Sequence, residues 1–334
     1  MRHSFFTSCI WILLVISLCL TLCSCGGSAI SGESQLSANK PDGSAASNGE
    51  SAASEKMDAS QSGETGSRDN TPVVLVGVAD GVSTIGNESV VIDISHTSDG
   101  YMMVDYTGSN PKVKCQLTGP DQITYTYNLS EGYDTFPLTA GNGSYTIGIF
   151  EFMDGSSYST LFTQSFEVSI TNEFGPYLYA NQYVNFTSDS ACVEKGAALA
   201  RSANNDVEVI QNVYNYIITN FTYDYAKAET VESGYLPDVD EICNVQTGIC
   251  FDYAAVMATM LRTQNIPTRL EVGYMEDVYH AWISTYISGE GWVNGIIEFD
   301  GSEWNLMDPT FASTSSDPIQ FTTELDKYIT KYVY

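Results

Sequence analysis

The chain has 334 residues, enough for two ordinary domains, and 43% of its residues are hydrophobic, which excludes disorder over the whole length. Its formal net charge of −28 would repel nucleic acid, and it disfavours acidic substrates and direct docking on anionic lipid head groups. Attachment to a membrane must therefore be covalent or hydrophobic.

Residues 1–24 have the pattern of an export signal, with a short positive head followed by an apolar run that ends at Leu22. The next residues resemble the bacterial lipobox, in which a lipid is placed on the cysteine after cleavage. Cys25 is the better lipidation site, because small Ser24 precedes it whereas bulky Leu22 precedes Cys23. The alternatives are a plain cleaved signal and a single membrane-spanning helix, for which the run is short. The expected location is the outer face of the bacterial cell membrane, held by a lipid anchor.

Residues 25–71 consist mainly of Ser, Gly, Ala, Asn and Glu, with almost no large apolar side chain. Such a segment cannot bury enough surface to offset its loss of chain entropy. We therefore expect a flexible tether.

Residues 72–171 form the next predicted domain, in which short runs alternate between apolar and polar residues and are separated by turn residues. Roughly seven strands in about a hundred residues is typical of an Ig-like β-sandwich. The domain shows no chemical constellation, since His96 stands alone and Cys115 has the position of a small buried apolar residue. We expect a spacer or a binding module. The strand-like runs are 90–94, 101–104, 113–117, 123–127, 145–150 and 162–168.

Residues 172–334 open with two helical stretches, the second marked by apolar residues at helical spacing from Val207 to Phe221. A loop is expected from Tyr223 to Gly248. Its acidic segment 237–241 does not have the spacing of an EF-hand, so a solvated acidic loop is the stronger interpretation than a calcium site. No metal and no organic cofactor is required by these residues.

Cys250 is predicted to lie at the first turn of a buried helix. Gly248 ends the preceding loop, good helix formers follow from Ala254 to Arg262, and Pro267 stops the helix. The unpaired N–H groups and the dipole at a helix N-terminus favour a thiolate, which is the reactive form of cysteine.

A β region follows this helix. The runs 268–274, 279–287 and 292–299 are strand-like, and Asp300-Gly301 is a two-residue hairpin signal before a last strand that ends near Asp308. We therefore expect an α+β domain in which one helix packs on an antiparallel sheet.

His280 is the base that the C-terminal half can offer, because the two other histidines lie in the signal and in the predicted sandwich. A Cys–His pair needs a third group to orient the imidazole. Asp308 is the better candidate because Pro309 holds it extended, whereas Asp300 is explained by its turn. A Cys243–Cys250 disulfide would instead abolish catalysis. Tyr223 or Tyr225 could line the cleft near the thiol.

Three motifs resemble those of the bacterial transglutaminase-like superfamily, in the same order and local structure. They are Cys250-Phe251-Asp252-Tyr253-Ala254, His280-Ala281-Trp282 and Trp304 to Asp308-Pro309-Thr310, within approximately Gln182 to Phe311. The resemblance implies a papain-like α+β core with Cys250 as nucleophile, His280 as general acid/base and Asp308 as orienting group. Papain-type proteases themselves fit less well, since their histidine lies roughly 130–150 residues after the cysteine.

The resulting interpretation is a multidomain surface lipoprotein, with an all-β Ig-like sandwich followed by an α+β transglutaminase-like domain. Its expected activity is hydrolysis of peptide or amide bonds in a peptide or protein substrate. The alternatives are a transamidase that cross-links surface proteins and a non-catalytic binding lipoprotein.

Overall fold

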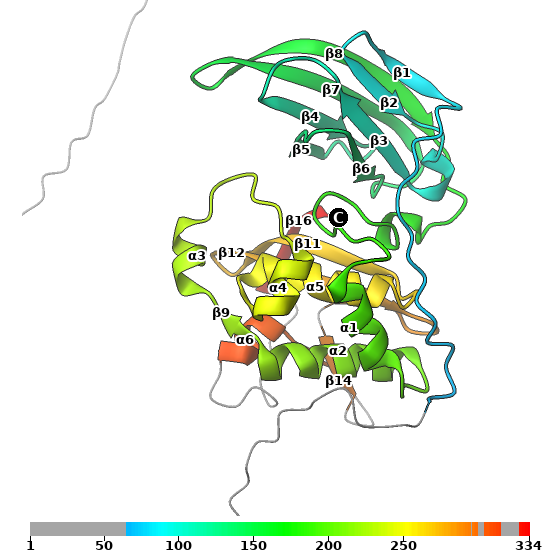
Figure 1. Cartoon of the computed structure of the whole chain (residues 1–334), viewed down its shortest axis with the longest axis vertical. Helices are drawn as coiled ribbons and strands as arrows, with labels where there is room; N and C mark the ends of the chain where they lie inside the picture. The colour runs from blue at the N-terminus through cyan, green and yellow to red at the C-terminus, as the bar shows by residue number, and fades with distance from the viewer. Residues whose placement is uncertain (1–64, 295, 300–303, 315–326) are drawn as a thin grey trace, which may run out of the picture. The chain divides into compact units, whose positions relative to one another are not determined.

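The structure is a computed structural model that describes residues 65–294, 296–299, 304–314 and 327–334 (Figure 1). The predicted export signal, the lipidation site Cys25, most of the predicted tether and the expected Asp300-Gly301 turn lie outside these residues. All of the described residues belong to one compact unit, Ser54–Tyr334. In the part of the chain that is described, no helix combines the length and the apolar character needed to cross a membrane.

Two four-stranded antiparallel sheets form the first half of the described chain. Both contribute to one hydrophobic core, and alternate residues of β4 (Val113, Cys115 and Leu117) point into it. The buried position predicted for Cys115 is therefore confirmed, while the immunoglobulin-like character of the domain stays a prediction. One sheet has the order β1 (Thr84–Asn87), β2 (Val90–Asp93), β3 (Tyr101–Tyr106), β6 (Tyr133–Pro137). The other has the order β5 (Thr124–Asn128), β4 (Val113–Thr118), β7 (Gly143–Asp154), β8 (Ser157–Val168).

The prediction that His96 stands alone is wrong. Its Nδ1 lies 3.0 Å from Asp99 Oδ2 and its Nε2 lies 3.1 Å from Asp80 Oδ2. The hydrogen bond to Asp99 raises the pKa of His96, an effect that its partial burial opposes. Asp80 is sixteen residues earlier in the chain, so only the fold brings it to the imidazole.

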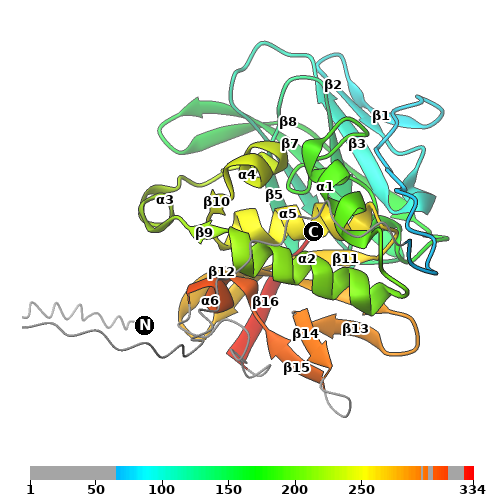
Figure 2. The ribbon, with the colours of Figure 1, turned by 60° about the horizontal axis from the view of Figure 1, so that its bottom comes forward.

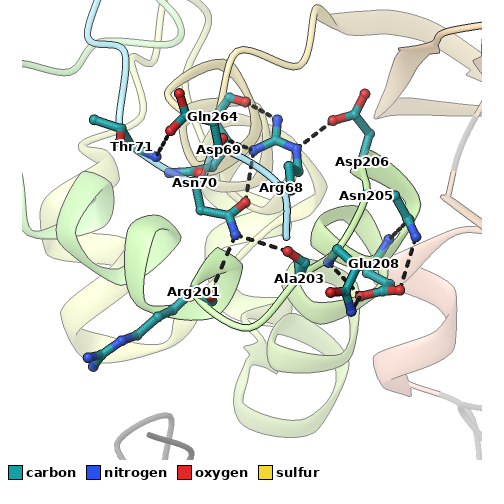
Figure 3. A network of polar contacts seen from close by, with 11 residues as sticks. Arg68, Asp69, Asn70, Thr71, Arg201, Ala203, Asn205, Asp206, Glu208 and Gln264 are labelled. Atoms are coloured by element: carbon teal, nitrogen blue, oxygen red, sulfur yellow. Dashed lines mark hydrogen bonds and ion pairs between the residues drawn. The ribbon is translucent and has the colours of Figure 1, made fainter. Parts of the chain in front are cut away.

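The end of the predicted tether is attached to the C-terminal half (Figure 3). Arg68 Nε lies 2.6 Å from Asp206 Oδ1, and Arg68 Nη2 donates to the carbonyl of Gln264. Gly66 N donates to the carbonyl of Arg201 at 3.0 Å. The prediction that the flexible tether reaches residue 71 is therefore wrong for residues 66–71. The polar composition of residues 66–71 concealed this, because their contacts are hydrogen bonds rather than buried apolar surface.

Helix α2 confirms the predicted second helix. It spans Asp206–Asn220, and Asn205 caps it by accepting a hydrogen bond from Glu208 N at 2.9 Å. Helix α1 (Ala191–Ala200) precedes it.

The loop predicted from Tyr223 to Gly248 instead holds two helices, α3 (Tyr225–Thr230) and α4 (Val239–Val245). The acidic segment 237–241 supplies the cap of α4. Asp238 Oδ1 accepts from the N–H groups of Asp240 and Glu241, at 3.2 and 2.9 Å. Negative side chains in these positions satisfy free N–H groups and complement the helix dipole. The prediction of a loop is therefore wrong for residues 239–241, which belong to α4, whereas Asp238 and Glu241 are exposed to solvent as predicted.

Helix α5 (Cys250–Arg262) lies in the centre of the C-terminal half (Figure 2). It packs against α1, α2 and α4 and against strands β11 (Thr268–Met275) and β12 (Val278–Ile287), and every residue from Asp252 to Arg262 is buried. The helix predicted after Cys250 and the two strands that follow are confirmed.

The sheet beside α5 is antiparallel and has the order β13-β12-β11-β16, with β13 at Gly291–Asn294 and β16 at Tyr328–Val333. The predicted single strand 292–299 is divided. β13 pairs with β12, whereas β14 (Ile296–Phe299) pairs with β15 (Trp304–Met307). Helix α6 (Pro309–Thr314) follows β15. Two short strands, β9 (Thr222–Tyr223) and β10 (Thr247–Gly248), pair in parallel just before α5.

Gly196 lets α1 approach α5 closely. A Cβ atom at this position would lie 3.0 Å from Met260 Cα and 3.1 Å from Met260 Cβ.

We predict that Gly196→Val lowers the free energy of unfolding by about 1–3 kcal/mol, because the valine side chain would press on the Met260 backbone and push α1 and α5 apart. Ala198→Val, at an exposed position of the same helix, should cost less than about 0.7 kcal/mol. Urea unfolding measures both, and equal losses would contradict the close approach.

Candidate active site

Cys250 is the first residue of α5 and is half-buried. Parallel pairing of β10 with β9 fixes the direction from which the chain enters the helix, and Ile249 is the extended residue at the N-cap. A Cβ atom at Gly248 would lie 2.6 Å from Asp252 Cβ. A glycine is thus needed for the turn that presents the cysteine.

His280 and Asp308 form a buried pair. His280 Nε2 lies 2.7 Å from Asp308 Oδ2, and the two side chains are 3% and 2% exposed. Asp308 also accepts hydrogen bonds from Thr310 N at 2.9 Å (Oδ1) and from the Tyr328 hydroxyl at 3.0 Å (Oδ2). These contacts satisfy a carboxylate that would otherwise be costly to bury.

Cys250 also acts on the imidazole of His280. Burial lowers the pKa of His280, but the charge of Asp308 and its hydrogen bond raise it to about 10, and a hydrogen bond to the Cys250 side chain acts in the same direction. The fold therefore brings together the three side chains Cys250, His280 and Asp308, which lie up to 58 residues apart in sequence (308 − 250). A protonated imidazole stabilises a neighbouring thiolate.

Tyrosines surround Cys250. Burial raises the pKa of Tyr223 to about 12, and the charge of Cys250 adds to the effect, while the Cys250 backbone N–H bonds to the phenol and opposes it. Tyr225 is 64% exposed, and its ring lies 5.0 Å from that of Tyr223 in an edge-on arrangement. Of the two tyrosines expected near the thiol, Tyr223 therefore lies against Cys250 and Tyr225 lies against Tyr223.

Two further aromatic residues were not anticipated. Tyr279 is 59% exposed, and its pKa is raised by burial of the phenol, with a contribution from Cys250. It precedes His280 in β12, and strand alternation gave no reason to expect both next to one thiol. Tyr328, which binds Asp308, had no sequence signal, because β16 joins the sheet through a long-range pairing with β11.

The Cys243–Cys250 disulfide considered as an alternative is absent from the structure. The described cysteines Cys115, Cys192, Cys243 and Cys250 are all free thiols. Cys243 shares a hydrogen bond with Cys192 rather than with Cys250, and this bond lowers the pKa of Cys243 while burial opposes it. The other candidate for the third group, Asp300, lies outside the described residues.

The described residues hold no group of three or more His, Cys, Asp or Glu side chains arranged to bind a metal ion. The acidic segment around Asp238 and Asp240 is used within the fold. Asp240 Oδ1 accepts the N–H of Cys192 at 2.9 Å, at the first turn of α1. Its carboxylates therefore serve as helix caps in this structure.

The family model of the transglutaminase-like superfamily matches residues 195–295, a segment that contains both Cys250 and His280. This segment is a transglutaminase-like domain. Asp308 lies beyond the matched residues, and no curated protein matches the chain.

Solved structures similar to the chain are distant from it. A proposed cysteine protease from Cytophaga hutchinsonii has 13% identity and a TM-score of 0.36, over 76% of this chain and 74% of that one. Red sea bream transglutaminase has 15% identity and a TM-score of 0.25, over 63% of this chain and 48% of that one. The periplasmic domain of TgpA from Pseudomonas aeruginosa, bound to ethylmercury, has 13% identity and a TM-score of 0.30, over 68% of this chain and 97% of that one.

We predict that Asp308→Asn lowers the pKa of His280 below its ordinary value, because burial then opposes the charged ring without a carboxylate to compensate. In the wild type the folded pKa lies above the unfolded one. The stabilisation by this pair is therefore fully present below about pH 6.5 and is lost as the pH rises toward 10.

NMR titration of the His280 ring, assigned with a His280→Gln variant, measures this pKa directly. The difference in free energy of unfolding between wild type and Asp308→Asn should shrink as the pH rises from 6.5 to 10. A His280 ring that titrates at the same pH in both proteins would contradict the prediction.

Proposed function

We propose that the transglutaminase-like domain is a cysteine peptidase or amidase in which Cys250, His280 and Asp308 act as a triad. The observation that carries the proposal is the buried pair of His280 Nε2 and Asp308 Oδ2 at 2.7 Å, together with the Cys250 side chain, whose interaction with the imidazole raises the pKa of His280. An imidazole held between a thiol and a carboxylate is the arrangement that activates a cysteine nucleophile.

The first step forms a thioester. The Cys250 thiolate attacks the carbonyl carbon of an amide, and backbone N–H groups at the start of α5 stabilise the oxyanion. As the carbon–nitrogen bond breaks, the His280 imidazolium donates its proton to the departing amine, which leaves neutral.

The second step releases the acyl group. Neutral His280 takes a proton from water, the hydroxide attacks the thioester carbon, and the carboxylic acid leaves as the Cys250 thiolate reforms. Asp308 keeps the ring in one orientation and stabilises its charged form. An amine in place of water would give a cross-link, which is the transamidase alternative. We favour hydrolysis.

The test compares wild type with Cys250→Ala on a quenched-fluorescent peptide library, and with a fluorescent amine plus capped glutamine peptides. We predict a fall in kcat/KM of at least about 10⁴-fold, since covalent catalysis is lost with the sulfur. Cys115→Ala, in the sandwich core, is the matched control and should keep the activity. Amine incorporation by the wild type would favour the transamidase.

Rapid alkylation of wild-type Cys250 by iodoacetamide below pH 7 is also expected. An unreactive Cys250, together with equal peptide cleavage by wild type and Cys250→Ala, would leave the non-catalytic binding lipoprotein as the better hypothesis.

We further propose that the protein is exported and lipid-anchored through Cys25, with residues 72–171 as an Ig-like spacer or binding module. The support is the short positive head, the apolar run and the small residue before Cys25.

We predict that Cys25→Ser abolishes incorporation of radiolabelled palmitate and moves the protein to the soluble fraction, whereas Cys23→Ser retains both label and membrane attachment. The opposite result would place the lipid on Cys23, and label in neither wild type nor variants would contradict the anchor.

A further inference from the structure

Three side chains form a closed polar triangle beside the cysteine. Lys227 Nζ lies 2.6 Å from Asp252 Oδ2 and donates to the Tyr235 hydroxyl at 2.7 Å. That hydroxyl donates to Asp252 Oδ1 at 2.7 Å. Asp252 is fully buried, and Lys227 is 27% exposed. The triangle joins helix α3, the segment after it and the first turn of α5.

Asp252 holds the backbone on which Cys250 sits. Its Oδ2 accepts the N–H of Ile249 at 2.9 Å, which is one half of a capping box. Ile249 directly precedes the cysteine and Asp252 follows two residues later. The carboxylate that binds Lys227 therefore also fixes the turn that presents the thiol.

The positive charge of Lys227 compensates the negative charge of Asp252. A fully buried carboxylate next to a helix N-terminus is stabilised by a cation at hydrogen-bond distance, and removing that cation leaves an uncompensated negative charge. Such a charge lies two residues from Cys250 and disfavours a thiolate by like-charge repulsion.

The same contact holds α3 against the site. Asp224 caps α3 by accepting from Lys227 N at 2.9 Å, and Asp224 N donates to the carbonyl of Gly248 at 2.9 Å. The exposed ring of Tyr225 continues this wall next to Tyr223, which lies against Cys250. The Lys227 ammonium also lies 4.3 Å from the centre of the Tyr235 ring.

We propose that Lys227 is a positioning residue, which balances the charge of Asp252 at the first turn of α5 and holds α3 as a wall of the site, so that no unpaired negative charge opposes the Cys250 thiolate. The proposal rests on the proposed function, in which Cys250 is the nucleophile. Among the described residues, the other titratable groups near this corner are Tyr223, Tyr225, Tyr235, Tyr253, Tyr279, His280 and Asp308, with Asp238 and Glu241 on the side of Tyr235.

The test is the rate of Cys250 alkylation by neutral iodoacetamide between pH 5 and 9. Lys227→Met should move the half-maximal rate up by about one pH unit, which is about tenfold slower reaction at pH 6. Asp252→Asn should move it down by a similar amount, because the cation then remains unopposed. Lys227→Arg should restore the wild-type profile. Turnover of Lys227→Met should show a lower kcat at an unchanged KM.

Lys195→Met is the matched control. Lys195 is also half-buried and lies over a tyrosine ring, 5.2 Å from the centre of Tyr216, so the substitution removes a similar contact elsewhere. Its alkylation profile should equal that of the wild type.

Opposite shifts in Lys227→Met and Asp252→Asn support the proposal, and unchanged profiles or shifts of the same sign overturn it. If Lys227→Met does not fold, the alkylation profile of Asp252→Asn decides. A shift of its half-maximal rate to lower pH supports the proposal, and a shift to higher pH or no shift overturns it. Alkylation needs no turnover, so opposite shifts in a chain that cleaves no amide would contradict the proposed function while confirming the effect of Lys227 on the Cys250 thiol.

Discussion

The buried contact between His280 Nε2 and Asp308 Oδ2 is the constraint on which the site depends. Two ionisable groups that are almost completely excluded from water must neutralise each other, and their remaining hydrogen-bonding capacity must be satisfied. Thr310 N and the Tyr328 hydroxyl do this for Asp308. The requirement ties together β12, the junction of β15 with α6, and β16.

The opposite side of the site is built on the first turn of α5. Asp252 satisfies the N–H of Ile249, and Lys227 balances its charge. Cys250 therefore has the buried His280–Asp308 pair on one side and the half-buried Lys227–Asp252 pair on the other. A side chain in such surroundings keeps its geometry because a movement of either pair would expose an unbalanced charge to a low-dielectric environment.

The acidity of the chain has a local use that its total charge does not reveal. Asp224, Asp238 and Asp252 all accept backbone N–H groups at or near helix N-termini. Each contact satisfies a donor that the helix leaves unpaired. Part of the negative charge of the C-terminal half is thus structural rather than a simple means of solubility.

Local signals in the sequence determined the helix that begins at Cys250, the buried strand around Cys115, the two strands that follow α5, and Cys250, His280 and Asp308 as candidates for one site. These features rest on spacing, helix stop signals and short motifs, which act over a few residues. Only the tertiary structure decided that Tyr328 binds Asp308, that Lys227 balances Asp252, that Arg68 anchors the end of the predicted tether, and that β13 and β14 separate. The three side-chain contacts join residues that are distant in sequence and become neighbours only in the fold. A contact of this kind leaves no periodicity in the chain, because either partner alone has the composition of an ordinary loop or surface.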